Sequence, residues 1–139
     1  MNTLTETQDY LNTIAETMNL LDSQRDMFQF LIDLGQEFDE LSDVSLATIV
    51  PGCLSKVWVQ TEVVEDGRVQ ISGAAEALIV KGYVAILANA LSGLTVADLA
   101  QTEPMIRDFI LQSKISQSAL PTRSNAFASV YEVILGLSL

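Results

Sequence analysis

The chain has 139 residues, with 18 acidic and 7 basic side chains, a net charge of −11 at pH 7, one cysteine and no histidine. The lack of histidine excludes catalytic pairs and triads that use imidazole, and a lone cysteine can form neither an internal disulfide nor a multi-thiolate metal site. The negative charge disfavours nucleic acid and anionic membranes as ligands, and it favours a partner with a positively charged docking face.

The sequence predicts no targeting or membrane segment. Residues 1–6 lack the basic and apolar regions of a secretory signal. The longest apolar stretch, residues 77–91, is interrupted by Lys81 and Asn89 and is too short to cross a bilayer. We therefore expect a soluble cytoplasmic protein that binds no nucleic acid and no membrane, as a monomer or a weak homodimer. Cytosolic reduction would keep the thiol free.

The first part of the chain predicts two amphipathic helices. Thr3 and Glu6 have the spacing of a capping box, and apolar residues then recur at helical spacing. A second helix is predicted from Gln24 to Leu34, with Gly35 as its C-terminal stop.

The next segment, residues 37–48, is acidic and shows neither helical nor strand periodicity. Phe38 and Leu41 are the residues expected to attach it to the core. No regular element is predicted within it.

Two runs of alternating apolar and polar residues, 57–64 and 69–72, predict a β-hairpin. A two-residue Asp-Gly turn would divide the valines between the two faces of the hairpin. A three-residue loop with Gly67 in the left-handed conformation instead pairs Val63 with Val69 and keeps the valines on one face. We therefore predict the three-residue loop.

The stretch after the hairpin predicts the central buried helix, because residues 76–91 are apolar on nearly every side. Gly82 in its middle indicates close packing against a neighbouring element. Further helices are predicted at residues 96–101, at 104–113 and from residue 121 onwards, with a loop at 116–120. This order predicts an α+β fold, with a small antiparallel sheet packed against helices, in one domain over residues 1–139.

The single cysteine lies between a Pro-Gly turn and the start of the first predicted strand. Loops on a rigid scaffold often carry reactive groups, which makes Cys53 a candidate nucleophile. Free cysteine is also among the most buried residue types, so a packing role for Cys53 is equally consistent with these residues. Trp58, on the face opposite the valines, either covers this loop or packs under the helices.

Four separated stretches resemble the motifs of one protein family, in the right order and with fitting spacing. They are similar to its I-E-L-G, G-C-x-S-x-V-W, I-V-K/R-G and L-x-P-S-R-S-N-G motifs, at Leu31–Gly35, Gly52–Trp58, Ile79–Gly82 and Leu120–Asn125. The chain resembles the SufE family of sulfur acceptors in iron–sulfur cluster assembly, over most of its length.

This resemblance implies an α+β fold related to the iron–sulfur scaffold proteins, and a role beside a pyridoxal-phosphate-dependent cysteine desulfurase. Cys53 would accept persulfide sulfur from the desulfurase, stimulate that enzyme, and pass the sulfur to an iron–sulfur scaffold or another recipient. The protein would be an accessory and not an enzyme. The pyridoxal phosphate belongs to the partner, and this chain is expected to bind no cofactor and no metal.

The residues expected to support the cysteine or to bind the partner are Gly52, Ser55, Lys56, Trp58, Glu76 and Arg123. Sulfur transfer needs a thiolate, and the thiol pKa of about 8.5 falls beside cations or backbone N–H groups. Lys56 and Arg123 are the candidate cations, although a lysine on a strand more often points to water and Arg123 is equally suited to an ordinary salt bridge. Glu76 either contacts the partner or favours the N-terminus of its helix.

The chain departs from the family pattern at several positions. Ala126 follows Asn125 where the family usually has glycine, and only Glu76 remains of two acidic residues before the central helix. Leu54 and Lys56 stand where glutamines are common. These differences bear on docking contacts. The alternative to the acceptor role is a binding or regulatory module in which Cys53 is a packing residue, whereas an iron–sulfur scaffold fits poorly because one thiolate cannot hold a cluster.

Overall fold

The computed structural model describes residues 2–52, 55–115 and 126–139. Its elements run in the order α1 (Leu4–Leu20), α2 (Gln24–Glu37), β1 (Thr48–Ile49), β2 (Val57–Val63), β3 (Val69–Ala75), α3 (Leu78–Leu91), α4 (Val96–Leu99), α5 (Glu103–Gln112) and α6 (Ala126–Ser138). The three strands form one antiparallel sheet in the order β1-β2-β3. The predicted α+β class is confirmed.

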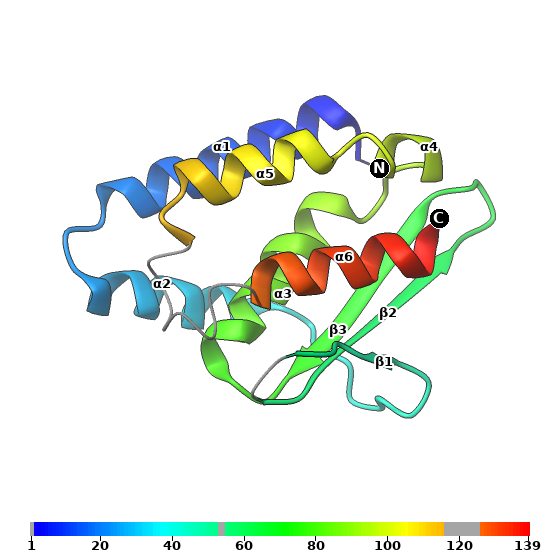
Figure 1. Ribbon diagram of the computed structural model, residues 1–139, viewed down its shortest axis with the longest axis horizontal. Coiled ribbons are helices and arrows are strands. Elements are labelled where there is room, and N and C mark those ends of the chain that lie inside the picture. Colours follow the sequence, from blue (N-terminus) through cyan, green and yellow to red (C-terminus); the bar gives the residue numbers. More distant parts are fainter. Residues whose placement is uncertain (1, 53–54, 116–125) are drawn as a thin grey trace.

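The helices are stacked in layers on one side of the sheet (Figure 1). Helix α3 packs against β3 and α6 packs against β2, while α1 lies beside α5 and contacts α3 from the side away from the sheet. Helix α2 packs along α3. The fully buried side chains come from several of these elements and include Leu11, Met18, Leu31, Ile86, Leu87 and Phe127.

The hairpin has the predicted register, with Val63 opposite Val69. Its loop spans three residues, because the Val64 N–H donates to the Arg68 carbonyl at 2.9 Å, and Gly67 has a φ of +80°. On the face towards the helices, Val57 is fully buried. The alternation of the valines therefore fixed this register correctly.

Two features of the sheet were not predicted. Strand β1 pairs with β2 through Thr48 opposite Val59 and Ile49 opposite Trp58, at the end of the segment 37–48 that was expected to be irregular. A strand of two residues is too short to show a periodicity of two. Strand β3 also continues to Ala75, although the residues from Gly73 were expected only to lead into the helix. Glycine and alanine have low strand propensity, so nothing in this part of the sequence predicts a strand.

The prediction for Gly35 is wrong, whereas the prediction for Gly82 is confirmed. Helix α2 continues through Gly35 to Glu37. A Cβ on Gly35 would lie 3.0 Å from the Gly82 backbone nitrogen, and a Cβ on Gly82 would lie closer than 3.0 Å to the Leu31 carbonyl oxygen. The two glycines are therefore required by the close crossing of α2 and α3, and not by a helix end.

Most predicted helix starts agree with the structure, whereas the central helix, predicted from residue 76, begins at Leu78. The Thr3 hydroxyl accepts a hydrogen bond from the Glu6 N–H at 3.1 Å, and the Thr95 hydroxyl accepts one from the Asp98 N–H at 3.1 Å. Pro104 lies in the first turn of α5. The loop expected at 116–120 and the expected start of the last helix at residue 121 lie outside the described residues. Within the described ranges, no helix is both long and apolar enough to span a membrane.

Candidate functional site

The cysteine motif, Gly52–Trp58, begins in the sequence between β1 and β2 and ends within β2, which starts at Val57. The Val50 N–H donates to the Val57 carbonyl at 2.8 Å, which closes the connection at its base. Gly52 is exposed and has a φ of +81°, with open space around the position of a Cβ. The left-handed backbone, and not crowding, therefore requires glycine at this turn. Cys53 and Leu54 lie outside the described residues.

The end of this connection is attached to the junction of β3 and α3. The Lys56 N–H donates to Glu76 Oε1 at 2.7 Å, and the Glu76 N–H donates to the Lys56 carbonyl at 3.0 Å. Helix α3 begins at Leu78 without a side-chain cap. Glu76 lies two residues before α3 begins, and its carboxylate accepts a hydrogen bond from the Lys56 backbone instead of capping the helix.

The remaining predicted residues differ in their placement. Ser55 is half-buried and the Lys56 side chain is exposed. Trp58 is half-buried and lies opposite Ala74, on the face of the sheet away from the valines. The structure therefore brings Gly52, Ser55, Lys56 and Glu76 to one corner of the sheet, whereas Arg123 and the motif around it lie outside the described residues.

One carboxylate at this corner, that of Glu40, was missed in the sequence. Glu40 Oε2 accepts a hydrogen bond from the Ala75 N–H at 3.2 Å, and Oε1 lies 3.4 Å from Lys81 Nζ. The ion pair gives Lys81, the lysine of the Ile79–Gly82 motif, a structural role. Through its two contacts, Glu40 attaches the acidic segment after α2 to α3 and to the end of β3, next to Glu76. Glu40 stands among several acidic residues, so no pattern distinguished it.

The acidic segment is also ordered by a turn before β1. The Ser45 backbone N–H donates to the Asp43 carboxylate at 3.0 Å, and this hydrogen bond lowers the pKa of Asp43 below its ordinary value. Among the residues that the structure describes, no cluster of three or more cysteine, aspartate or glutamate side chains is arranged to hold a metal ion.

Taken together, these contacts define a short connection that is closed at its base, turns at an exposed glycine and is fastened at its far end. Connections held on a rigid scaffold in this way often carry functional groups. The family model of the SufE domain, described as an Fe-S metabolism associated domain, matches residues 12–137. The chain belongs to the SufE family.

Curated relatives agree with this assignment. The chain is 30% identical over 127 residues to the sulfur acceptor protein CsdE of Escherichia coli. This match covers 88% of this chain and 84% of CsdE. It is 35% identical over 88 residues to the uncharacterized SufE-like protein slr1419 of Synechocystis, which covers 63% of this chain and 53% of that protein. The match therefore spans only about half the length of the Synechocystis relative.

A solved structure shows the same fold. The solution structure of a hypothetical protein from Thermus thermophilus superposes with a TM-score of 0.74, covering 93% of each chain at 17% sequence identity. At this identity the likeness concerns the fold alone.

Proposed function

We propose that this SufE-family chain is a sulfur acceptor and carrier in iron–sulfur metabolism. Cys53 takes persulfide sulfur from a pyridoxal-phosphate-dependent cysteine desulfurase, stimulates that enzyme by removing its product, and passes the sulfur to an iron–sulfur scaffold or another recipient. The observation that carries the proposal is that the one cysteine of this SufE-family sequence directly follows Gly52 and stands three residues before Lys56, whose backbone N–H is held by Glu76. The name of the Escherichia coli relative, a sulfur acceptor protein, supports it.

The transfer is a thiol exchange without net oxidation or reduction. The Cys53 thiolate attacks the outer sulfur of the desulfurase persulfide, and a new S–S bond forms at Cys53. The S–S bond within the desulfurase breaks, and its electron pair leaves on the desulfurase cysteine as a thiolate. Pyridoxal phosphate therefore acts only in the partner, and the chain serves as an accessory protein and not as an enzyme.

The neighbouring residues have separate parts in this proposal. Gly52 permits the turn and Ser55 shapes the connection beyond the cysteine. The exposed ammonium of Lys56 favours the thiolate, because a nearby cation lowers a thiol pKa. Glu76 holds the backbone of Lys56. Trp58 supports the connection from the sheet, and Arg123 contacts the partner.

The direct functional test is Cys53→Ser in a cysteine desulfurase assay. A purified desulfurase is given cysteine, and alanine production is measured with and without this protein. We expect the wild-type chain to raise the turnover of the enzyme and Cys53→Ser to raise it no further than buffer does. Ser42→Ala, at an exposed position outside the connection, is the matched control and should stimulate like the wild type.

Full stimulation by Cys53→Ser would contradict the proposal. It would favour a binding or regulatory module in which the cysteine is a packing residue. Equal loss of stimulation in Ser42→Ala would show that the assay reports a general loss of folding and not the thiol.

A further inference from the structure

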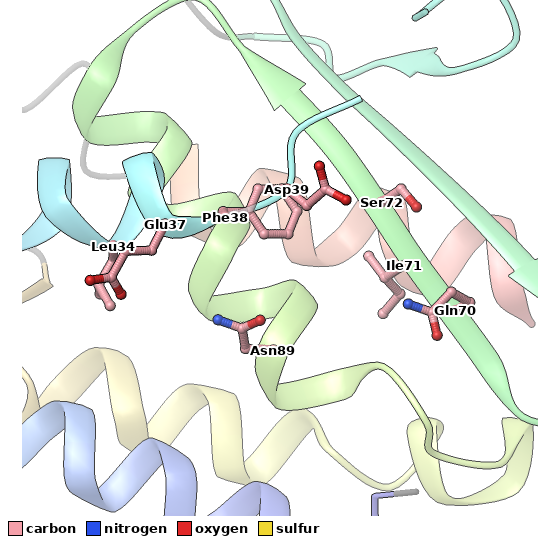
Figure 2. A pocket seen from close by; sticks show the side chains of 8 residues that line it. All are labelled: Leu34, Glu37, Phe38, Asp39, Gln70, Ile71, Ser72 and Asn89. Carbon is pink, nitrogen blue, oxygen red and sulfur yellow. The ribbon is translucent and has the colours of Figure 1, made fainter. Parts of the chain in front are cut away.

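A groove lies along the free edge of β3, away from the cysteine connection (Figure 2). One hollow of this groove has a volume of about 390 Å³. Figure 2 shows Glu37 at the end of α2 and Asp39 on the chain that follows it, close to Ser72 of β3, with Gln70 and Ile71 farther along the strand and Asn89 on α3. This volume is at the lower end of the range of about 300–1,000 Å³ that is usual for ligand pockets.

A second hollow of about 460 Å³ extends this groove towards the N-terminus of α1. The two hollows share Gln70 and Asn89, and the second one adds Glu6 and Tyr10. The Asn89 amide donates to the Tyr10 hydroxyl at 3.3 Å, and burial raises the pKa of Tyr10 above its ordinary value. We call the two hollows together the β3-edge groove.

The β3-edge groove is acidic. Glu6, Glu37 and Asp39 line it, and no lysine or arginine is among its lining residues. Arg68 donates to the carbonyls of two residues at the far end, Asn2 at 3.1 Å and Gly93 at 2.6 Å, and its guanidinium also lies 3.5 Å from Asp66. The positive charge of Arg68 at the end of the groove is paired with Asp66, which leaves the carboxylates of Glu6, Glu37 and Asp39 to attract a cationic ligand.

The backbone of β3 restricts how a ligand can bind. The Ile71 N–H donates to the Ser92 hydroxyl at 3.0 Å, and the Gly73 carbonyl accepts from the Leu41 N–H at 2.9 Å. The Val69 N–H donates to the Leu94 carbonyl at 2.8 Å. A partner strand therefore cannot add to this edge along its whole length, so a ligand must bind mainly through side chains of the groove.

We propose that the β3-edge groove docks an extended segment of a partner protein that carries arginine or lysine. The three carboxylates would pair with its cationic side chains, while the amides of Gln70 and Asn89 would bind its backbone. Strand β3 runs from the groove to the cysteine corner, and the six residue steps from Gln70 to Glu76 span about 20 Å. An interface of ordinary size, about 800 Å² per partner, covers both places.

The partner is the cysteine desulfurase that supplies sulfur to Cys53, an assignment that rests on the proposed function. The binding of a basic segment to the groove does not depend on it. The two statements can therefore be tested separately.

The binding test uses the full chain labelled with ¹⁵N and a five-residue probe, acetyl-Ser-Arg-Val-Arg-Ser-amide, followed by NMR. We expect shift changes at Glu37–Asp39, at Gln70–Ser72 and in the side-chain amides of Gln70 and Asn89. The matched probe with glutamine in place of both arginines should bind more weakly. Raising the salt from about 50 to about 300 mM should weaken binding of the arginine probe, because exposed charges are screened.

Charge variants locate the binding. The double variant Glu37→Gln/Asp39→Asn should weaken the arginine probe about fivefold, a typical effect of removing two exposed charge pairs. The control Glu16→Gln/Glu65→Gln makes the same change in net charge at two exposed positions that do not line the groove, and it should bind like the wild type.

Equal binding of the two probes, equal weakening by both double variants, or shift changes confined to another surface would each overturn the groove proposal. Cys53→Ser should bind the arginine probe like the wild type. The double variant Glu37→Gln/Asp39→Asn should also raise the concentration of the chain needed for half-maximal stimulation of the desulfurase. If Cys53 carries sulfur but the probe does not bind, only the groove proposal fails. If the probe binds but Cys53 carries no sulfur, only the partner assignment fails.

Discussion

Two hydrogen bonds between Lys56 and Glu76 hold the end of the cysteine connection to the rest of the fold. Only one of them uses a side chain, the bond of 2.7 Å from the Lys56 N–H to the Glu76 carboxylate. The other joins two backbone groups and continues the ladder of the hairpin. The side chain of Glu76 can therefore be changed without removing the second bond.

We predict that Glu76→Ala loosens the connection after the cysteine. Loss of one hydrogen bond, worth about 1 kcal/mol, should speed hydrogen exchange of the Lys56 amide about fivefold. Glu76→Gln should have a smaller effect, because its carboxamide oxygen can still accept the bond. The measurement is amide exchange by NMR, and sulfur transfer to Cys53 should slow in the same order.

Glu65→Ala is the control for this experiment, since Glu65 is an exposed acid in the hairpin loop. Its Lys56 amide should exchange at the wild-type rate. Unchanged protection of the Lys56 amide in Glu76→Ala would show that this contact does not hold the connection.

For single residues, the sequence identifies candidate positions more reliably than it predicts the contacts that they make. Pro51 and Gly52 predicted a turn, and the φ of +81° at Gly52 confirms it. Glu76 was selected as a candidate, but its hydrogen bond to the Lys56 backbone joins positions 20 residues apart in the chain. No local pattern encodes such a contact, because it depends on how the hairpin brings the two positions together.

Glycines inside helices have opposite roles in two elements of this fold. Gly82 of α3 faces the Leu31 carbonyl, where a Cβ would lie closer than 3.0 Å to backbone. Gly136 of α6 is exposed and has open space where its Cβ would stand. The two positions form a matched pair, because the same substitution meets backbone in one helix and solvent in the other.

We predict that Gly82→Ala lowers the free energy of unfolding by about 1–3 kcal/mol, the usual cost of an overpacked core. Gly136→Ala should raise it by about 0.5–1 kcal/mol, because alanine loses less backbone entropy than glycine in a helix. Urea unfolding of both variants, compared at equal m-values, measures the difference. Wild-type stability of Gly82→Ala would show that α2 and α3 do not cross as closely as described.

The elements also show where sequence patterns stop being informative. The hairpin register was predictable because a shift of one residue would turn every valine to the other face. The role of Gly35 was not predictable, because a single sequence does not distinguish a glycine that ends a helix from a glycine that allows two helices to cross closely. Strand β1 is too short for any pattern, and its pairing with β2 depends on the rest of the sheet.

For the whole molecule, the net charge of −11 and the lack of histidine already exclude many kinds of chemistry. The family motifs then indicate the SufE domain, and the family match over residues 12–137 confirms it. The β3-edge groove could not be predicted in this way, because its carboxylates come from α1 and from the end of α2 and the turn after it, and its amides from β3 and α3. A single domain over residues 1–139 stays a prediction.

The proposed function depends above all on Cys53 carrying sulfur between proteins. The most direct measurement is the intact mass of the full chain after incubation with a cysteine desulfurase, its pyridoxal phosphate and cysteine. We predict that the wild-type chain gains the mass of one sulfur atom, that a reductant removes it, and that Cys53→Ser gains none. A wild-type chain that stays unmodified beside an active desulfurase, or a Cys53→Ser chain that gains the same mass, would contradict the account.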